Sequence, residues 1–305
     1  MEKFLKNNNI LLGIIFALAA AALNGSIGVI SKLLMNSGLN SNDIAFLKTA
    51  IACILLSVLL IKTPIAKQMA FIRALSRNFF WLKVACCAFL GIFVLFYFET
   101  IAYQYGNASD VVVVLMASAA VSALLFGAAL LKEKISIAAV SGTLLAVGGI
   151  FIISWSGGND FLLILNSIFA GLGYGLFSVM VKKFGFKGGL YLTRFLLFFG
   201  MIYLAIPFAQ TFHGLELNLY SILALCALAL LPTILGFYCT TKALQYLSAA
   251  KVQVTELSEP LFAVVLAWLF LSEYPSIHFW IGAFFVILGI MLINNILFVL
   301  RKSET

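Results

Sequence analysis

Two stretches, YFETIAYQYGNASDVVVVL at 97–115 and YCTTKALQYLSAAKVQVTEL at 238–257, align at one constant offset and decide the fold. The residues identical at this offset include Tyr97 and Tyr238, Thr100 and Thr241, Ala102 and Ala243, Gln104 and Gln245, Tyr105 and Tyr246, and Ala108 and Ala249. After one gap, Glu133, Gly142 and Gly149 match Glu273, Gly282 and Gly289. The chain therefore contains an internal repeat.

Composition places both copies in a membrane. Of the 305 residues, 64% are hydrophobic and only 10% are charged, which leaves too little polar surface for a soluble protein of this length. Many apolar runs approach the ~20 residues that a helix needs to cross a bilayer. The composition predicts an all-α integral membrane protein.

Ten transmembrane helices are predicted. Their expected ranges are 10–35, 43–62, 79–105, 108–131, 135–154, 161–183, 189–208, 217–246, 250–271 and 277–300. Residues 1–155 then form the first repeat and 156–305 the second, with five spans each. Because five is odd, the second repeat must enter the membrane from the opposite side. The sequence therefore predicts two inverted five-helix repeats.

The basic residues orient the helices. If the N-terminus is inside, fifteen of the nineteen lysines and arginines fall in inner segments, and the outer loops hold none. This bias predicts that both termini are cytoplasmic. The net charge of +8 then reflects topology and contact with anionic lipid, so no nucleic-acid partner is expected. The N-terminal apolar run continues to about Met35 and is interpreted as a first span, because a signal peptide would be shorter.

Inverted repeats are typical of secondary transporters, with a site near the membrane midplane between the halves. No Walker A loop occurs, so ATP is not expected to drive the protein directly. The segment GLGYG at 171–175 lies inside a span and has the wrong spacing for a dinucleotide site, which favours close helix packing or a hinge.

The C-terminal third also resembles a known family. SEPLFAVVLAWLFLSEYPSIHFWIGAFFVILGIMLI at 258–293 is similar to the second EamA repeat of the drug/metabolite transporter superfamily, and LLFGAALLKEKISIAAVSGTLLAVGGIFII at 124–153 is similar to the first. The matching positions are Glu259, Pro260, Glu273 and Gly282. The resemblance implies a 5+5 carrier of small organic solutes, commonly amino acids or related metabolites. Two positions depart from the family pattern, Ala119 in place of a frequent proline and Lys48 in place of a common arginine.

Seven charged residues stand inside spans, and each needs a reason because a charge at a helix centre costs about 2.5–3.5 kcal/mol. They are Lys32, Lys48, Arg194, Lys242, Glu99, Glu256 and Glu259. One interpretation is that they form ion pairs or gates, Lys48 with Glu99 and either Arg194 or Lys242 with Glu256. Lys32 could instead reach the outer surface.

The other interpretation concerns Glu256 and Glu259, which stand one turn apart beside Pro260. Proline removes the helical partner of the carbonyl of residue 256, so we expect a kink there that lines a cavity. Both acids would then attract an amine or a proton; in the alternative, they are locked in ion pairs at a simple kink. Other candidates for the cavity are Asn24, Tyr97, Gln104, Tyr174, Tyr238, Gln253 and Trp268.

The sequence thus predicts a secondary transporter that moves an amino acid or a related amine by alternating access. Export and proton coupling are further hypotheses. The alternatives are an uptake carrier or exchanger for a nucleoside- or sulfonium-type metabolite, an intramembrane enzyme, or a channel. We expect no enzyme activity, because no catalytic or metal-binding constellation is recognisable, and no cofactor or metal. A bacterial inner membrane and a monomer or homodimer complete the expectation.

Overall fold

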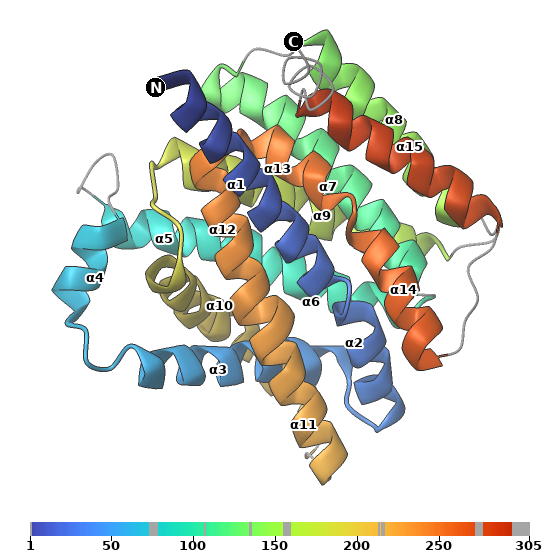
Figure 1. Cartoon of the computed structure of the whole chain (residues 1–305). Helices are drawn as coiled ribbons and strands as arrows, with labels where there is room; N and C mark the ends of the chain where they lie inside the picture. Colours follow the sequence, from blue (N-terminus) through green and yellow to red (C-terminus); the bar gives the residue numbers. More distant parts are fainter. Residues whose placement is uncertain are drawn as a thin grey trace.

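A computed structural model describes residues 2–72, 79–106, 108–133, 136–154, 160–212, 214, 217–271 and 277–294 (Figure 1). These residues form helices joined by short connections, and no strand occurs among them. The expected all-α membrane fold is confirmed. Glu273, one of the family positions, lies outside the described residues.

The described residues of the first half form nine helical elements. They are α1 (Glu2–Asn24), α2 (Ile27–Asn36), α3 (Ser41–Leu59), α4 (Ile65–Ile72), α5 (Phe80–Ala88), the π-helix η1 (Phe89–Val94), α6 (Leu95–Ala102), α7 (Ala108–Leu131) and α8 (Ile137–Ser154). Helix α3 begins at a capping box in which Asn40 and Asp43 each bind the other's backbone N–H, which fixes its first turn.

The part of the second half that the structure describes forms eight more. They are α9 (Phe161–Lys183), α10 (Leu190–Thr211), α11 (Leu219–Leu228), the π-helix η2 (Ala229–Gly236), α12 (Phe237–Tyr246), α13 (Ala249–Glu256), α14 (Glu259–Leu271) and α15 (Ile277–Ile293). Side chains cap α9, α11 and α13 at their N-termini, through Asp160, Asn218 and Ser248.

Seven helical segments of the described chain are long and apolar enough to cross a membrane. They are Asn9–Asn36, Ser41–Leu59, Phe80–Ala102, Asp110–Leu131, Phe161–Lys183, Leu190–Thr211 and Leu219–Tyr246. Two shorter apolar segments, Ile137–Gly149 and Trp280–Ile293, stand where the fifth and tenth spans are expected. The chain is a multi-pass membrane protein, whereas a total of ten crossings stays a prediction.

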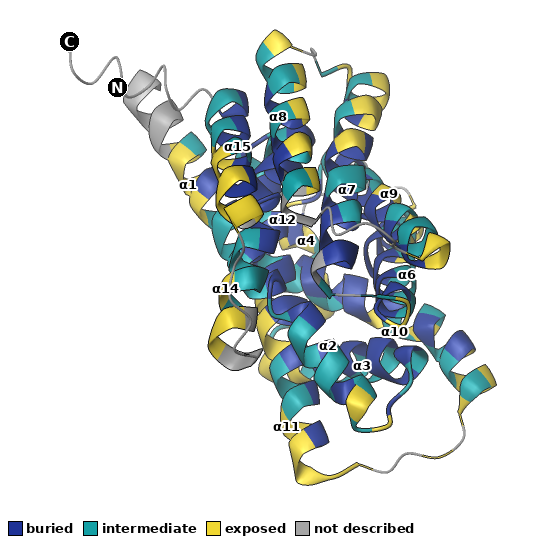
Figure 2. Cartoon of the chain, turned by 90° about the vertical axis from the view of Figure 1, so that its right-hand side faces the viewer, coloured by how far each residue is buried: buried dark blue, intermediate teal, exposed yellow. Residues whose placement is uncertain are grey.

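Exposed leucine, isoleucine and phenylalanine side chains cover the outside of the bundle, and buried residues gather inside it (Figure 2). This distribution suits a bundle whose outer surface faces lipid.

The two halves share irregular features at matching places. η1 interrupts the helix from Phe80 to Ala102, and η2 interrupts the helix from Leu219 to Tyr246 at the offset that relates Tyr97 to Tyr238. A π-helical turn leaves the regular hydrogen-bond ladder and is common at functional sites. The conserved spacing of these two interruptions supports the internal repeat that the sequence predicts.

Helices α8 and α15 lie side by side as an antiparallel pair (Figure 1), and the glycines between them indicate a two-fold relation. A Cβ on Gly142 would lie 2.8 Å from the carbonyl oxygen of Gly289, and a Cβ on Gly149 would lie 2.6 Å from that of Gly282. Gly142 is the repeat equivalent of Gly282, and Gly149 is the repeat equivalent of Gly289. Replacing each glycine by its equivalent therefore turns the first contact into the second, as a two-fold axis requires. Bulkier residues would separate these backbones.

Two expected spans are broken. The first changes at Gly25 and Ser26, where α1 gives way to α2, and the ninth changes at Leu257 and Ser258, between α13 and α14. Pro260 therefore stands in the first turn of α14, where its missing N–H removes no helical bond, and does not kink a continuous helix.

Candidate functional site

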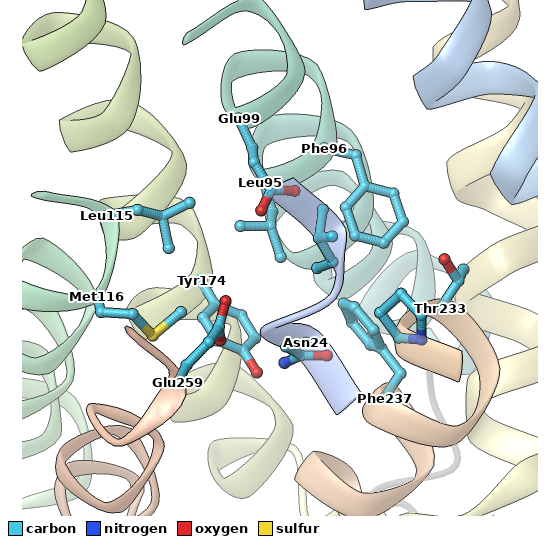
Figure 3. Close-up of a pocket in the computed structure, with 12 residues that line it drawn as sticks. Asn24, Leu95, Phe96, Glu99, Leu115, Met116, Tyr174, Thr233, Phe237 and Glu259 are labelled. Carbon is cyan, nitrogen blue, oxygen red and sulfur yellow. The ribbon is translucent and has the colours of Figure 1, made fainter. Parts of the chain in front are cut away.

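A cavity lies where the two halves of the chain meet (Figure 3). Its lining residues come from α1, α2, α6, α7, α9, η2, α12 and α14, and they are Asn24, Ile27, Leu95, Phe96, Glu99, Leu115, Met116, Tyr174, Pro232, Thr233, Phe237 and Glu259. The centre of a water-sized sphere can move through about 10 Å³, which is room for about one water molecule. The structure thus shows a small, mostly apolar cavity between the repeats, with a few polar side chains in its wall.

Asn24 and Glu259 form the first polar group of this cavity. Asn24 is the last residue of α1 and Glu259 the first residue of α14, so both helix breaks bring a polar side chain into the interior. The two side chains lie next to each other and share a hydrogen bond (Figure 3). Asn24 is 6% and Glu259 2% exposed, and Glu259 Oε2 has no hydrogen-bond partner. Glu259 is therefore a buried carboxylate with an unused oxygen at the cavity wall.

Glu99 enters the cavity from α6 on another side (Figure 3). Its Oε2 lies 3.7 Å from Lys48 Nζ on α3, and Tyr103 donates a hydrogen bond of 3.1 Å to its Oε1. Lys48 is fully buried, and its Nζ lies 3.9 Å from the centre of the Phe96 ring. A lysine here has one carboxylate and one aromatic face beside it, and these contacts offset part of the cost of its burial.

Glu256 lies behind the cavity wall and binds only neutral donors among the interactions that the structure shows for it. Its carboxylate accepts hydrogen bonds from Tyr174 Oη at 2.8 Å, Thr240 Oγ1 at 2.7 Å and Gln253 Nε2 at 3.3 Å. Gln253 also donates to Ser178 Oγ at 2.9 Å. Three hydrogen bonds satisfy most of the carboxylate's acceptor capacity, so Glu256 ties α9, α12 and α13 together.

The sequence matches one family over nearly all of this architecture, the EamA-like transporter family, at residues 11–155 and again at 159–295. The chain belongs to the EamA-like transporter family. It is a membrane transporter.

Individual proteins also resemble this EamA-like chain. A protein of Clostridium kluyveri that is named an uncharacterized transporter is 26% identical over 291 residues, covering 91% of each chain. A solved crystal structure matches with a TM-score of 0.73 at 15% identity, over 96% of this chain and 99% of its own. The latter likeness shows the fold alone.

Four of the expected site residues line the cavity of this EamA-like protein, namely Asn24, Glu99, Tyr174 and Glu259. Glu256 and Gln253 form the network next to Tyr174. The remaining expected residues do not line the cavity: Tyr97 stacks on Phe93, Gln104 is exposed near the end of the third span, Tyr238 packs on Phe16, and Trp268 is 45% exposed.

The expected partners of Glu256 are placed elsewhere. Arg194 donates hydrogen bonds to Gln68 Oε1 at 3.0 Å and to Ser57 Oγ at 3.3 Å. Lys242 Nζ lies 5.9 Å from the centre of the Tyr238 ring. An ion pair of Glu256 with either residue is thus not what the structure shows. The reason is that Thr240 and Tyr174 already surround the carboxylate.

Several site residues give no clear signal in the sequence. Thr240, Tyr103 and Thr233 are polar but common in membrane helices, and the aromatic lining residues Phe96 and Phe237 resemble packing residues. Only the repeat motif around Thr241 could have drawn attention to Thr240. Among the described residues, no group of three or more His, Cys, Asp or Glu side chains could hold a metal ion.

Two lysines cap equivalent loops at the two ends of the bundle. Lys32 donates to the Gly106 carbonyl at 2.5 Å, after α6, and Lys182 donates to the Leu247 carbonyl at 2.7 Å, after α12. Gly106 and Leu247 are related by the offset that relates Tyr97 to Tyr238. These lysines therefore fasten the third-to-fourth and eighth-to-ninth connections in the same way, one in each repeat.

Lys182 has further partners. It also donates to the Leu244 carbonyl at 3.2 Å, and its charge lies near Glu133. The backbone N–H of Ala249, at the start of α13, binds the Glu133 carboxylate. Partial burial raises the pKa of Glu133 above its usual value, and the charge of Lys182 acts in the opposite direction. More polar interactions thus stabilise the end of the bundle at Lys182 than the end at Lys32.

Proposed function

We propose that the protein is a secondary carrier that exports a small amine-bearing metabolite by alternating access. The observation that supports this most strongly is the position of Glu259. Its carboxylate is buried at a cavity between the repeats, with one oxygen unpartnered and Asn24 as its neutral neighbour. A carboxylate in such a place has a strong requirement for a positive charge.

Two observations support alternating access, namely the repeat symmetry and the small size of the cavity. The cavity has room for about one water molecule, so it cannot hold an organic solute in the form that the structure shows. Inverted repeats have two related arrangements that open to opposite sides. We infer that the cavity widens when either arrangement forms and that the closed form lies between them.

Proton coupling is part of the same proposal. When the amine leaves, the charge on Glu259 again lacks a counter-ion, and a proton is the smallest cation that could replace it. We propose that transport is directed outward, because members of the family tend to be exporters. We also propose that both termini are cytoplasmic, because the basic residues gather in the inner segments. The protein is proposed to lie in a bacterial inner membrane.

Counterflow in proteoliposomes tests the carrier. Vesicles preloaded with unlabelled amines and amino acids should accumulate labelled substrate in a saturable way, while a channel would show no counterflow. Glu259→Gln should lower exchange by about tenfold or more, because it removes a charge-assisted interaction. Asp160→Asn is the matched control, since Asp160 is an exposed helix cap and asparagine caps equally well.

Wild-type exchange in Glu259→Gln would refute the role of this carboxylate. Direction is measured separately in cells, where an exporter lowers the internal amount of its substrate. A pH-sensitive dye inside the vesicles reports whether protons move in exchange, and an unchanged internal pH during amine exchange would refute the coupling.

A further inference from the structure

The charged groups around the cavity do not balance. Glu99 and Glu259 both line it, whereas Lys48 is the basic residue that the structure pairs with either of them. The other polar residues that line it, Asn24, Tyr174 and Thr233, are neutral. With these carboxylates and this lysine ionised, the cavity wall carries one negative charge in excess.

Lys48 is committed to Glu99. Its Nζ lies 3.7 Å from Glu99 Oε2 and 3.9 Å from the centre of the Phe96 ring, and it does not reach the cavity wall. A substrate carboxylate would have to draw Lys48 away from Glu99. That exchange would leave Glu99 as an unpaired charge in the interior, which is strongly unfavourable.

The excess negative charge belongs to Glu259. The charged groups near it are two other carboxylates, Glu99 and Glu256, and its hydrogen bond comes from the neutral amide of Asn24. Glu256 does not line the cavity and takes its hydrogen bonds from Tyr174, Thr240 and Gln253. Glu259 therefore offers its free oxygen to a cation, and the Phe237 ring in the same cavity wall suits an alkylammonium group.

We propose that the cavity selects organic cations of net charge +1, amines that lack a carboxylate, and that the Lys48–Glu99 pair excludes zwitterionic amino acids. The ammonium group binds Glu259 and Asn24. Lys48 does not bind the substrate; it determines specificity by neutralising Glu99. This inference rests on the proposed carrier function and narrows its substrate class.

The test compares matched pairs that differ by one carboxylate. Proteoliposomes at neutral pH are assayed for counterflow with tyramine and tyrosine, phenethylamine and phenylalanine, and isoamylamine and leucine. We expect at least one amine to exchange about tenfold or more faster than its amino acid, since a mismatched charge loses a charge-assisted contact.

The Glu99→Gln variant sharpens the test, because it should gain the ability to exchange amino acids. The change frees Lys48 from its partner, so a substrate carboxylate can bind it, and the ratio of amino-acid to amine exchange should rise about tenfold. Asp160→Asn is the control and should keep the wild-type ratio. If Glu99→Gln fails to fold, as judged by size-exclusion chromatography, the wild-type pairs alone decide.

The outcomes separate the two proposals. Amino acids that exchange as fast as, or faster than, their amines in the wild type would overturn the charge selectivity and leave the carrier function standing. Absence of exchange for every pair would overturn both. An unchanged ratio in a folded Glu99→Gln protein would overturn the role given to the Lys48–Glu99 pair.

Discussion

Helix α9 packs on α7, and the broken helix α1–α2 packs on α13–α14, in equivalent places of the two repeats. The first pair is continuous on both sides, while both members of the second pair are interrupted. Gly175 faces Ala119 in the continuous pair, and its equivalent Gly25 faces Glu259, Phe262 and Ala263 in the broken pair. The same packing is thus kept while the backbone differs.

The difference shows how an inverted repeat acquires an asymmetric site. The breaks create helix ends inside the bundle, and these ends carry Asn24 and Glu259. The first turn of α14 stabilises the Glu259 carboxylate through the helix dipole. At the equivalent places of the continuous pair stand Tyr174 and Ser118, so the broken pair contributes the charge to the cavity and the continuous pair contributes the aromatic ring of Tyr174.

Breaking the continuous pair should have the largest effect. Ala119 is the equivalent of Pro260, but it is fully buried in the middle of α7. Ala119→Pro should cost about 3 kcal/mol or more, because proline removes a helical hydrogen bond and clashes with the preceding turn. This loss is measured by heating the protein in detergent and using size-exclusion chromatography to quantify the fraction that stays folded.

The reciprocal change, Pro260→Ala, is the control for that experiment. Pro260 stands in the first turn of α14, where its N–H is not needed, so alanine should leave stability nearly unchanged. If the two variants unfold at similar temperatures, the break between α13 and α14 does not explain why proline is tolerated at position 260.

The sequence predicts part of this comparison and misses the rest. Membrane-embedded charge and the family motif select Glu259, and hydropathy locates most of the helices, since both are local signals. The break at Gly25 is not predicted, because the preceding alanine-rich run has high helix propensity.

The partners of Glu256 are also missed, for a different reason. They depend on how α9, α12 and α13 pack, and spacing along the chain does not report that packing. Residue type misleads in the same way for Trp268, whose side chain is 45% exposed although an aromatic was a reasonable candidate for the cavity.

The glycines of the two pairs should differ in their tolerance of a methyl group. A Cβ on Gly175 would overlap the Ala119 carbonyl oxygen and lie 2.7 Å from Ser122 Cβ, whereas a Cβ on Gly25 would have 3.0–3.2 Å to its neighbours. Gly175→Ala should therefore destabilise by about 1–3 kcal/mol. Gly25→Ala should destabilise by less, in the same thermal-unfolding assay. An equal loss for both would mean that the broken pair is packed as tightly as the continuous one.

The capping lysines extend the comparison to the ends of the bundle. Lys182 binds two carbonyls and lies near Glu133, while one carbonyl bond is seen for Lys32. Lys182→Met should cost about 1–2 kcal/mol, and Lys32→Met less, because each lost bond involves a charged donor. Methionine keeps the length and the apolar part of the side chain. Limited proteolysis of the connections reports the loosening, and greater cleavage in Lys32→Met would reverse the proposed ranking of the two ends.

The smallest expected effect concerns pH at the Lys182 end. The pKa of Glu133 is raised in the folded protein by partial burial, so folding favours the protonated carboxyl. The stability it contributes is then present at low pH and is lost as pH rises from the ordinary carboxyl pKa of 4.5 through the raised pKa of Glu133. Wild type should therefore lose stability relative to Glu133→Gln over that range, by less than about 1 kcal/mol because the side chain is partly solvated. Melting temperatures of both proteins between pH 4 and 7 give the difference. A wild type that gains stability relative to Glu133→Gln with rising pH would show that Lys182 and the Ala249 N–H outweigh burial, and that this end is held by an ion pair.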